Sequence, residues 1–204
     1  MKESFPESHQ IVYKFYVGRQ AMFENDYETA SQYFEYAFQH CPSRYKKNKK
    51  IILVYLLPVN MLRGYMPKQN LLLKYDLKSF AEIVVAVKQG NIRKFNSDMV
   101  KYEDFFIENG VYLFLEKLKM TSYRNLFKRL ARLLNTAQIP IEIYVDILKY
   151  LGEDDMDTDV CQCILSNLIY ENKIKGYISQ KHNKLVISRD FKLAFPHLTA
   201  IKPS

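Results

Sequence analysis

The chain has 204 residues, of which 48% are hydrophobic and 14% aromatic, with 16 Tyr, 13 Phe and no Trp. This apolar content is ample for a packed core and excludes a disordered chain, and the length fits one large domain or two closely packed ones. The formal net charge of +8 favours a polyanionic partner such as RNA, DNA or an anionic membrane surface, although a basic surface that meets an acidic protein subunit has the same charge.

Cysteine usage and the apolar runs bear on the compartment. The odd set Cys41, Cys161 and Cys163 has no further Cys or His at zinc spacing, which favours reduced thiols in a cytosolic or nuclear protein. Met1–Ser8 lacks the apolar segment of a secretory signal, and the longest apolar run, Ile51–Leu57, is far shorter than the roughly 20 residues of a membrane span. We therefore expect a soluble intracellular protein.

The first helical segments form a pair. Apolar periodicity predicts helices over Ile11–Glu24 and Tyr27–His40, joined by a turn at Asn25-Asp26. The pair contains a tetratricopeptide-like (TPR-like) pattern of small and aromatic residues, namely Gly18, Ala30, Phe34, Ala37 and Pro42. Small residues let two helices approach closely, while an aromatic ring fills the groove between repeats. The sequence therefore predicts a TPR-like hairpin here.

Further helices follow along the chain. Arg44–Gly64 is predicted as a long helix that Pro58 interrupts and kinks. A second hairpin is predicted from Ser79–Lys88 and Ile92–Glu108, with a turn at Gln89-Gly90-Asn91. Val111–Leu134 is expected to form one or two helices.

Two features of this region concern its charges and its caps. Thr121-Ser122 is a plausible break, with Ser122 as an N-cap, and the stripe Arg124, Lys128 and Arg132 favours an acidic partner within the chain. The lysines at the start of the long helix are Lys46, Lys47, Lys49 and Lys50. We interpret them as a solvated helix start, with a nuclear-localisation patch or a second phosphate contact as alternatives.

The last third of the chain has the layout of a winged helix. Pro140 starts a predicted helix over Ile141–Leu151, and the acidic linker Glu153–Asp159 leads into a second helix over Val160–Glu171, which Asp157 or Thr158 can cap. Two predicted strands follow, Lys173–Ser179 and Lys184–Ser188, joined by Gln180–Asn183. The expected fold class is thus mainly α: stacked TPR-like helical hairpins (residues 1–136), a C-terminal winged helix (137–192) and a tail (193–204).

This order of elements resembles the PCI family of scaffold subunits, found in the proteasome lid, the signalosome and translation initiation complexes. The matching pieces are the TPR-like pair, the Gln89-Gly90-Asn91 turn and the run from Leu168 to Ile178. Three further segments resemble the branch of the family that serves nuclear mRNA export: Gln10–Arg19, Asn60–Gly64 and Asn167–Tyr177.

The resemblance implies a non-enzymatic subunit without a cofactor, in the nucleus and at the nuclear pore, with a cytoplasmic pool. It implies a large GANP-type scaffold subunit and a small acidic DSS-type protein as partners, and a nucleic-acid surface built from two neighbouring winged helices. Members of this branch carry further helical repeats before the region seen here, so we interpret the chain as a fragment or a short isoform.

The predicted nucleic-acid site lies on the wing and its flanks. Its residues are Lys173, Lys175, Tyr177, Lys181, His182, Lys184, Arg189 and Lys192. A cationic hairpin can follow a phosphate backbone without reading bases, and Tyr177 can stack a base, so we expect salt-sensitive, sequence-independent binding of RNA or single-stranded nucleic acid. The alternative is a solvated wing whose lysines only protect a sheet edge.

Other functions have less support in the residues. Val160–Glu171, at the position of a recognition helix, has no Arg or Lys to read guanine, which disfavours a sequence-specific transcription factor. Catalytic and phosphate-loop motifs are absent from the sequence, and the acidic linker lacks the pattern of a calcium loop. The competing hypothesis is a purely protein–protein scaffold of a lid-like or signalosome-like complex.

The apolar tail is the predicted partner interface. Its residues are Phe191, Leu193, Phe195 and Leu198. They need to be buried, either against this chain's own winged helix or against the winged helix of a partner.

Overall fold

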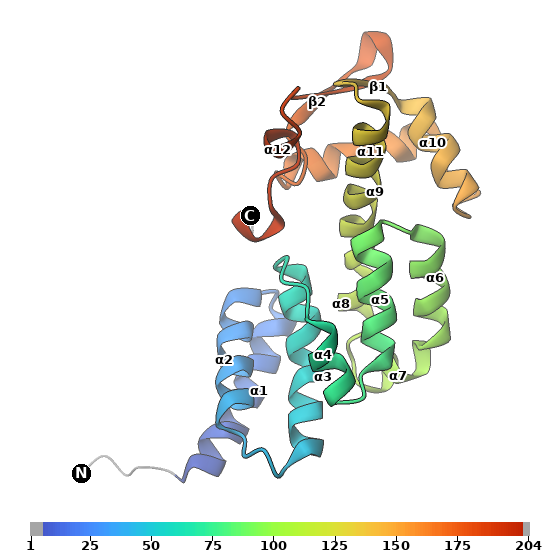
Figure 1. Cartoon of the computed structure of the whole chain (residues 1–204). Helices are drawn as coiled ribbons and strands as arrows, with labels where there is room; N and C mark the ends of the chain where they lie inside the picture. The colour runs from blue at the N-terminus through green and yellow to red at the C-terminus, as the bar shows by residue number, and fades with distance from the viewer. Residues whose placement is uncertain (1–5, 202–204) are drawn as a thin grey trace. The chain divides into compact units, whose positions relative to one another are not determined.

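The computed structural model describes residues 6–201, which are mostly helical with one small sheet, so the mainly α fold class predicted from the sequence is confirmed (Figure 1). In chain order the helices and strands are α1 (Glu7–Phe23), α2 (Tyr27–His40), α3 (Lys46–Leu62), α4 (Gln69–Lys74), α5 (Lys78–Gln89), α6 (Ile92–Lys101), α7 (Glu103–Glu108), α8 (Tyr112–Glu116), α9 (Leu118–Leu134), β1 (Gln138–Pro140), α10 (Ile141–Tyr150), α11 (Thr158–Tyr170), β2 (Gly176–Ser179), β3 (Lys184–Ile187) and α12 (Phe191–Ala194).

Two compact units make up the chain. One contains the residues up to Ala81 together with Glu103–Leu115, and the other contains Glu82–Tyr102 and the residues from Glu116 onward. The boundaries predicted from the sequence, at 136/137 and 192/193, follow the kind of secondary structure rather than compactness, and they stay predictions.

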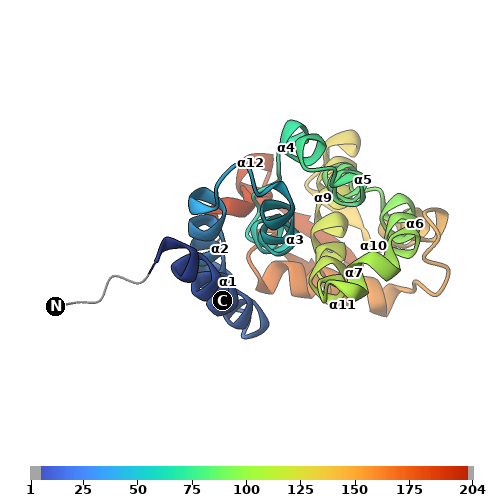
Figure 2. The same ribbon diagram turned by 90° about the horizontal axis from the view of Figure 1, so that it is seen from below.

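Close helix packing defines the first unit, in which α1, α2 and α3 lie side by side (Figures 1 and 2). A Cβ added at Gly18 would lie 3.1 Å from two atoms of the Phe34 ring, so the absent side chain is what allows α1 and α2 to approach here. Phe34 is fully buried and stacks on Tyr55 of α3, with ring centroids 6.0 Å apart. The small residue at Gly18 and the buried ring of Phe34 thus play the packing roles predicted for a TPR-like hairpin. Asp26 caps α2 by accepting a hydrogen bond from the Thr29 N–H.

Helix α3 differs from its prediction at Pro58, which lies inside a continuous helix. The expected interruption is wrong because every residue from Ile52 to Val59 is buried, and tertiary packing outweighs the hydrogen bond that a proline removes. At its start, Lys49 is buried and donates to the Phe38 carbonyl at 2.9 Å, and Lys50 pairs with Asp76.

The turn at Gln89-Gly90-Asn91 is confirmed in the second unit and is closely packed against α9. Gly90 has φ +63°, and a Cβ there would lie 2.4 Å from the Leu126 backbone nitrogen. Asn91 caps α6 by accepting from the Lys94 N–H at 3.0 Å. From α9, Asn125 and Arg129 donate to the last carbonyl groups of α5, so side chains of one helix terminate another.

Two helix boundaries correct the expectations from the sequence. The helix predicted over Ile92–Glu108 ends at Lys101, because Tyr102 leaves helical geometry with φ −115° and ψ 17°, and α7 starts at Glu103. The predicted break at Thr121-Ser122 lies inside α9. Ser122 is buried there and donates to the Leu118 carbonyl one turn back, so it is not an N-cap.

The winged helix shares a hydrophobic core with α9. Its fully buried side chains come from α9 (Phe127), α10 (Tyr144), α11 (Leu165), β3 (Leu185) and the tail (Phe195). Asp157 caps α11 through a 2.7 Å hydrogen bond from the Val160 N–H, as one of the two predicted caps. This core sets the position of the wing on the helices that precede it.

Candidate nucleic-acid interface

A three-stranded antiparallel sheet forms the wing, in the order β1-β3-β2. Val186 in the central strand lies opposite Tyr177 on one side and opposite Gln138 on the other, while Lys184 pairs with Ser179. Because opposite residues of an antiparallel pair project to the same face, Tyr177, Val186, Gln138 and Lys184 share one face of the sheet. The other face carries Leu185.

That second face packs into the core, so the first face is the one directed to solvent. Leu185 and Ile139 are fully buried, and Ile178 packs against the same cluster. Tyr177 is 62% exposed. We call the face with Tyr177, Val186, Gln138 and Lys184 the outer sheet face.

The wing tip is tied to both helices of the motif. Residues Gln180–His182 form a single 3₁₀ turn, and Asn183 follows with φ +47°. The Asn183 side chain donates to Glu142 of α10 at 2.6 Å and accepts from Gln162 of α11 at 2.9 Å. These bonds hold the hairpin in one position, which matters for a surface that recognises a regular backbone.

Most predicted cations of the wing have no acidic partner in the part of the chain that the structure describes. Within residues 6–201, the cationic side chains that make no ion pair include Lys175, Lys181, Lys184, Arg189 and Lys192. His182 is exposed beside them at the tip. Lys173 differs, since its ammonium group lies 2.7 Å from the Glu171 carboxylate. Of the eight predicted residues, six are therefore exposed and Lys184 is half-buried, while Lys173 is the one whose charge is paired within the described chain.

Lys173 also lies outside the sheet, because β2 starts at Gly176 rather than at the predicted residue. Its carbonyl group accepts a hydrogen bond from Nε of Arg124 at 3.4 Å. Arg124 also donates to the Asn125 side chain and to the Pro196 carbonyl. The acidic partner expected for Arg124 is therefore wrong: its partners are carbonyl groups at the start of the wing and in the tail, and no carboxylate of the described chain pairs with it.

Burial lowers the pKa of the Arg124 side chain. Only 4% of Arg124 is exposed, and burial together with the nearby charge of Arg132 lowers the pKa of its guanidinium to about 10. The group stays charged at neutral pH and is held by the carbonyl dipoles around it. Arg124 is therefore a structural cation that supports the wing, and it is not part of the exposed surface.

The predicted partner interface divides into buried and exposed residues. Phe195 is 2% exposed in the core of this chain, and Phe191 is half-buried against the same cluster. Leu198 is partly buried, while Leu193 is 59% exposed. The tail also bonds to the base of the wing, where the Lys175 N–H donates to the Ala194 carbonyl at 2.8 Å. Phe195 therefore packs against this chain's own winged helix, whereas Leu193 is exposed and accessible to a partner.

Helix α11, at the recognition position, presents a face without cations. Its exposed side chains are Asp159, Val160, Cys163, Ser166, Asn167 and Tyr170. The linker before it adds exposed carboxylates at Asp154, Asp155 and Asp157. The two parts of the winged helix therefore differ in charge. The wing is basic, whereas the exposed side chains of α11 and its linker are acidic or uncharged.

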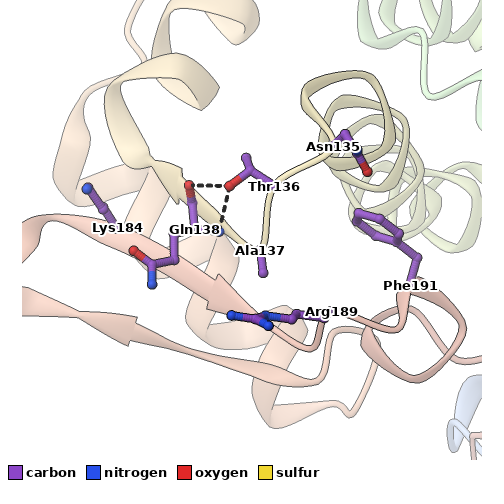
Figure 3. A pocket seen from close by; sticks show the side chains of 7 residues that line it. All are labelled: Asn135, Thr136, Ala137, Gln138, Lys184, Arg189 and Phe191. Atoms are coloured by element: carbon purple, nitrogen blue, oxygen red, sulfur yellow. Dashed lines mark hydrogen bonds between the residues drawn. The ribbon is translucent and has the colours of Figure 1, made fainter.

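A concave surface of about 520 Å³ opens beside the sheet (Figure 3). It is lined by Asn135, Thr136, Ala137, Gln138, Lys184, Arg189 and Phe191. In Figure 3 the guanidinium group of Arg189 extends back along the sheet below Ala137, toward the side where Gln138 and Lys184 lie. None of the described residues that line this surface is acidic.

Metal ligands, thiols and membrane-spanning helices are the other features of the chain that bear on its function. No group of three or more His, Cys, Asp or Glu side chains is arranged to hold a metal ion within residues 6–201. All three cysteines are free thiols, with Cys41 and Cys161 buried and Cys163 exposed. In the same range no helix combines the length and hydrophobicity that a membrane crossing requires.

Helical hairpins that lead into a winged helix define the PCI class of scaffold modules, and a family model described as PCI domain matches residues 99–189. The chain therefore contains a PCI domain, and the resemblance to this family is confirmed. It is 46% identical over 98% of its length to PCI domain-containing protein 2 of Xenopus laevis, and 44% identical over 88% to the Dictyostelium discoideum homolog. A more distant relative, at 28% identity over 95% of the chain, is the Protein CSN12 homolog of Neurospora crassa.

The alignments cover 50%, 42% and 46% of those three relatives, so the chain spans about half the length of the curated relatives it matches. What the whole relatives do is accordingly carried to this chain only as a proposal.

Sequence reasoning missed the residues of β1 and the loop before it, which line the concave surface. Gln138–Pro140 is a three-residue strand that ends in proline, so neither its length nor its composition signals a strand. Its one recognisable signal is Asn135, because asparagine commonly closes a helix in the left-handed conformation, and its φ here is +47°.

Proposed function

We propose that this chain is a non-catalytic scaffold subunit of an mRNA-export complex. In this proposal it binds a larger PCI-type subunit and contributes the basic wing to a surface for RNA or single-stranded nucleic acid. The proposal rests on the PCI domain, on the similarity to PCI domain-containing protein 2, and on the chemistry of the wing.

The observation that carries the nucleic-acid part is the set of cations without ion-pair partners on one hairpin. A surface cation can be compensated by a neighbouring carboxylate, as Lys173 is by Glu171. Lys175, Lys181 and Lys184 have no such partner among the described residues. Phosphate groups are the polyanion that such a hairpin can follow, with release of counterions as the driving force.

The partner part of the proposal rests on the exposed residues of α11 after Asp159, which are uncharged, and on the exposed Leu193. An interface core is typically poor in charge and rich in aromatic side chains, and Tyr170 is 78% exposed on α11. A GANP-type scaffold is the proposed large partner. A small acidic DSS-type protein fits the net charge of +8, and a nuclear, pore-associated location follows from the same resemblance.

A purely protein–protein scaffold without a nucleic-acid role is the second candidate. The same α11 face favours it, because it bears no cation at the position where many winged helices contact DNA. In this case the complex would be lid-like or signalosome-like, and the basic wing would contact an acidic protein surface.

The test is co-purification of the chain with a GANP-type scaffold, followed by titration with a labelled single-stranded RNA at two salt concentrations. Replacing Lys175 and Lys181 by Glu is expected to weaken RNA binding by the assembled pair at least about tenfold at low salt. Each phosphate contact that is lost should lower the slope of log affinity against log salt by about 0.7.

The matched control reverses two exposed cations outside the wing, Lys88 in α5 and Lys149 in α10, with the same change in net charge. If the wing and control variants bind RNA as tightly as the unchanged pair, the nucleic-acid role is wrong and the protein–protein scaffold is favoured. If no complex with the GANP-type scaffold forms, the partner assignment is wrong.

A further inference from the structure

The concave surface beside the sheet combines cations from the two ends of one strand. Lys184 is the first residue of β3, and Arg189 lies two residues after its last. Both line this concave surface, which we call the hollow. Neither side chain has an ion-pair partner among residues 6–201, and no carboxylate lines the hollow. Two cations without an ion-pair partner in the described chain that line one concavity favour binding of an anion there.

Neutral donors complete the lining. The Gln138 side-chain amide is exposed and makes no hydrogen bond of its own within the described chain, and Asn135 lies across the hollow. An amide NH₂ beside Lys and Arg is the donor set that phosphate oxygens accept from in protein–nucleic acid contacts. Phosphate is therefore a better match than an isolated carboxylate, since it presents more acceptor oxygens to four donor groups.

The hollow is preformed by hydrogen bonds in its floor. The Gln138 N–H donates to the Thr136 hydroxyl oxygen at 3.2 Å (Figure 3). The Ile187 N–H donates to the Ala137 carbonyl at 2.9 Å. The segment from Asn135 to Gln138, which supplies four of the seven lining residues, is thus fixed to β3, which supplies Lys184. Binding a ligand there costs little ordering of the backbone.

An aromatic platform lies on the same face. Tyr177 shares a row with Val186 and Gln138, two strand spacings from Gln138, which is about 10 Å. This separation suits a nucleotide whose phosphate is held at the hollow while an adjacent base reaches the tyrosine ring. Stacking on an exposed ring requires a base that is not already stacked in a duplex.

Resting on the proposed function, we propose that the hollow between β1 and the ends of β3 holds one backbone phosphate of a single-stranded nucleic acid, while a neighbouring base stacks on Tyr177. The strand then crosses the outer sheet face and avoids α11. The exposed carboxylates in the linker before α11 and in its first turn, among them Asp155 and Asp159, repel a phosphate backbone on that side. A duplex that spans both the wing and the recognition helix is disfavoured for the same reason.

The test uses the full chain, alone and assembled with its large partner, and measures binding of a labelled oligouridylate by fluorescence anisotropy. Lys184→Gln with Arg189→Gln is expected to weaken binding at least about tenfold and to lower the salt slope by about 1.4, the value for two lost contacts with a single strand. The control is Lys88→Gln with Lys149→Gln, which has the same charge change outside the wing and is expected to change binding less than twofold.

Substitutions of Tyr177 test base stacking separately from charge, because they leave the net charge of the chain unchanged. Tyr177→Ser is expected to weaken binding of the single strand about tenfold, and Tyr177→Phe to retain it, because the ring rather than the hydroxyl group stacks. Binding of a duplex of equal length is expected to be weaker from the outset and insensitive to both substitutions.

Each alternative has its own outcome. If the unchanged chain binds RNA, Lys175 and Lys181 substitutions weaken it, and the Lys184 and Arg189 pair behaves like the control, then the proposed function stands and the phosphate site is wrong. If the unchanged chain and its complex bind no RNA, the proposed function itself fails. If an oligoglutamate peptide displaces the RNA at equal charge concentration, or the duplex binds as tightly as the single strand, the hollow is an unspecific anion surface and the proposal is overturned.

Discussion

The Arg124 guanidinium on α9 donates a hydrogen bond to the Lys173 carbonyl, at the point where the chain leaves α11 for the wing. The same group donates to the Pro196 carbonyl and lies over the Phe195 ring, 5.6 Å from its centroid. One buried cation therefore joins the helix before the winged helix, the start of the wing and the tail.

Replacing Arg124 by Met is expected to lower the free energy of unfolding by about 2 kcal/mol, because buried carbonyl groups lose their donor. Urea denaturation measures this change. The control is Arg132→Met, an exposed residue of the same helix, for which a change within about 0.5 kcal/mol is expected. Equal effects of the two substitutions would show that Arg124 supports the wing no more than a surface residue does.

Glu153 gives the stability of the second unit a defined pH dependence. Burial opposes its ionisation, but hydrogen bonds from Lys119, Asn96 and Tyr123 outweigh burial and lower the pKa of Glu153 below its ordinary value of 4.5. A carboxyl group whose pKa is lower in the folded state stabilises the fold fully above its unfolded pKa, and this contribution is lost as the pH falls through the folded pKa.

Glu153→Gln is therefore expected to destabilise the chain by about 2 kcal/mol at pH 7, with the difference shrinking below pH 4.5. Denaturation curves between pH 3 and 7, about the range in which carboxyl groups titrate, measure it. Asp154→Asn changes a neighbouring exposed carboxyl group that makes no ion pair within residues 6–201, and it serves as the control. A difference that grows as the pH falls would contradict the assignment.

Substitutions at two glycines with similar backbone geometry distinguish the energetic cost of a steric contact from that of backbone strain. Gly90 has φ +63° and Gly110 has φ +66°, but an added Cβ meets the Leu126 backbone at Gly90 and nothing within 4 Å at Gly110. Gly110→Ala is expected to cost about 1 kcal/mol from left-handed strain alone. Gly90→Ala is expected to cost at least about 3 kcal/mol, because α9 has to shift. Thermal unfolding of both variants measures the two losses of stability. Equal losses would contradict the packing explanation.

The Asn183 side chain is expected to keep the wing tip in place. Asn183→Gly preserves the left-handed backbone but removes the bonds to Glu142 and Gln162, so hydrogen exchange of amides at the tip should speed up about tenfold, equivalent to about 1.4 kcal/mol of local stability. The control is Asn172→Gly, another left-handed asparagine, with φ +57° and an exposed side chain. Unchanged exchange in Asn183→Gly would mean that the sheet alone positions the tip.

The elements that the sequence predicted well have strong local signals. Gly18 with Phe34, the turn at Gly90 and the cap at Asp157 each depend on residues close in sequence or on a repeat of known spacing. The predictions that failed depended on distant contacts. Burial of α3 overrides the local effect of Pro58, and the carbonyl partners of Arg124 lie 49 and 72 residues away.

The sequence by itself determined the class of fold and the excess of positive charge on the wing, because periodicity, turn residues and composition are local properties. Only the tertiary structure decided which charges remain free. Folding pairs Lys173 with Glu171, buries Arg124 and Phe195, and adds β1 to the sheet, so that Gln138 comes to lie beside Lys184 and Arg189. The physical reason is that ion pairing, burial and strand pairing depend on groups that are distant in the chain, and only packing of the core brings them together.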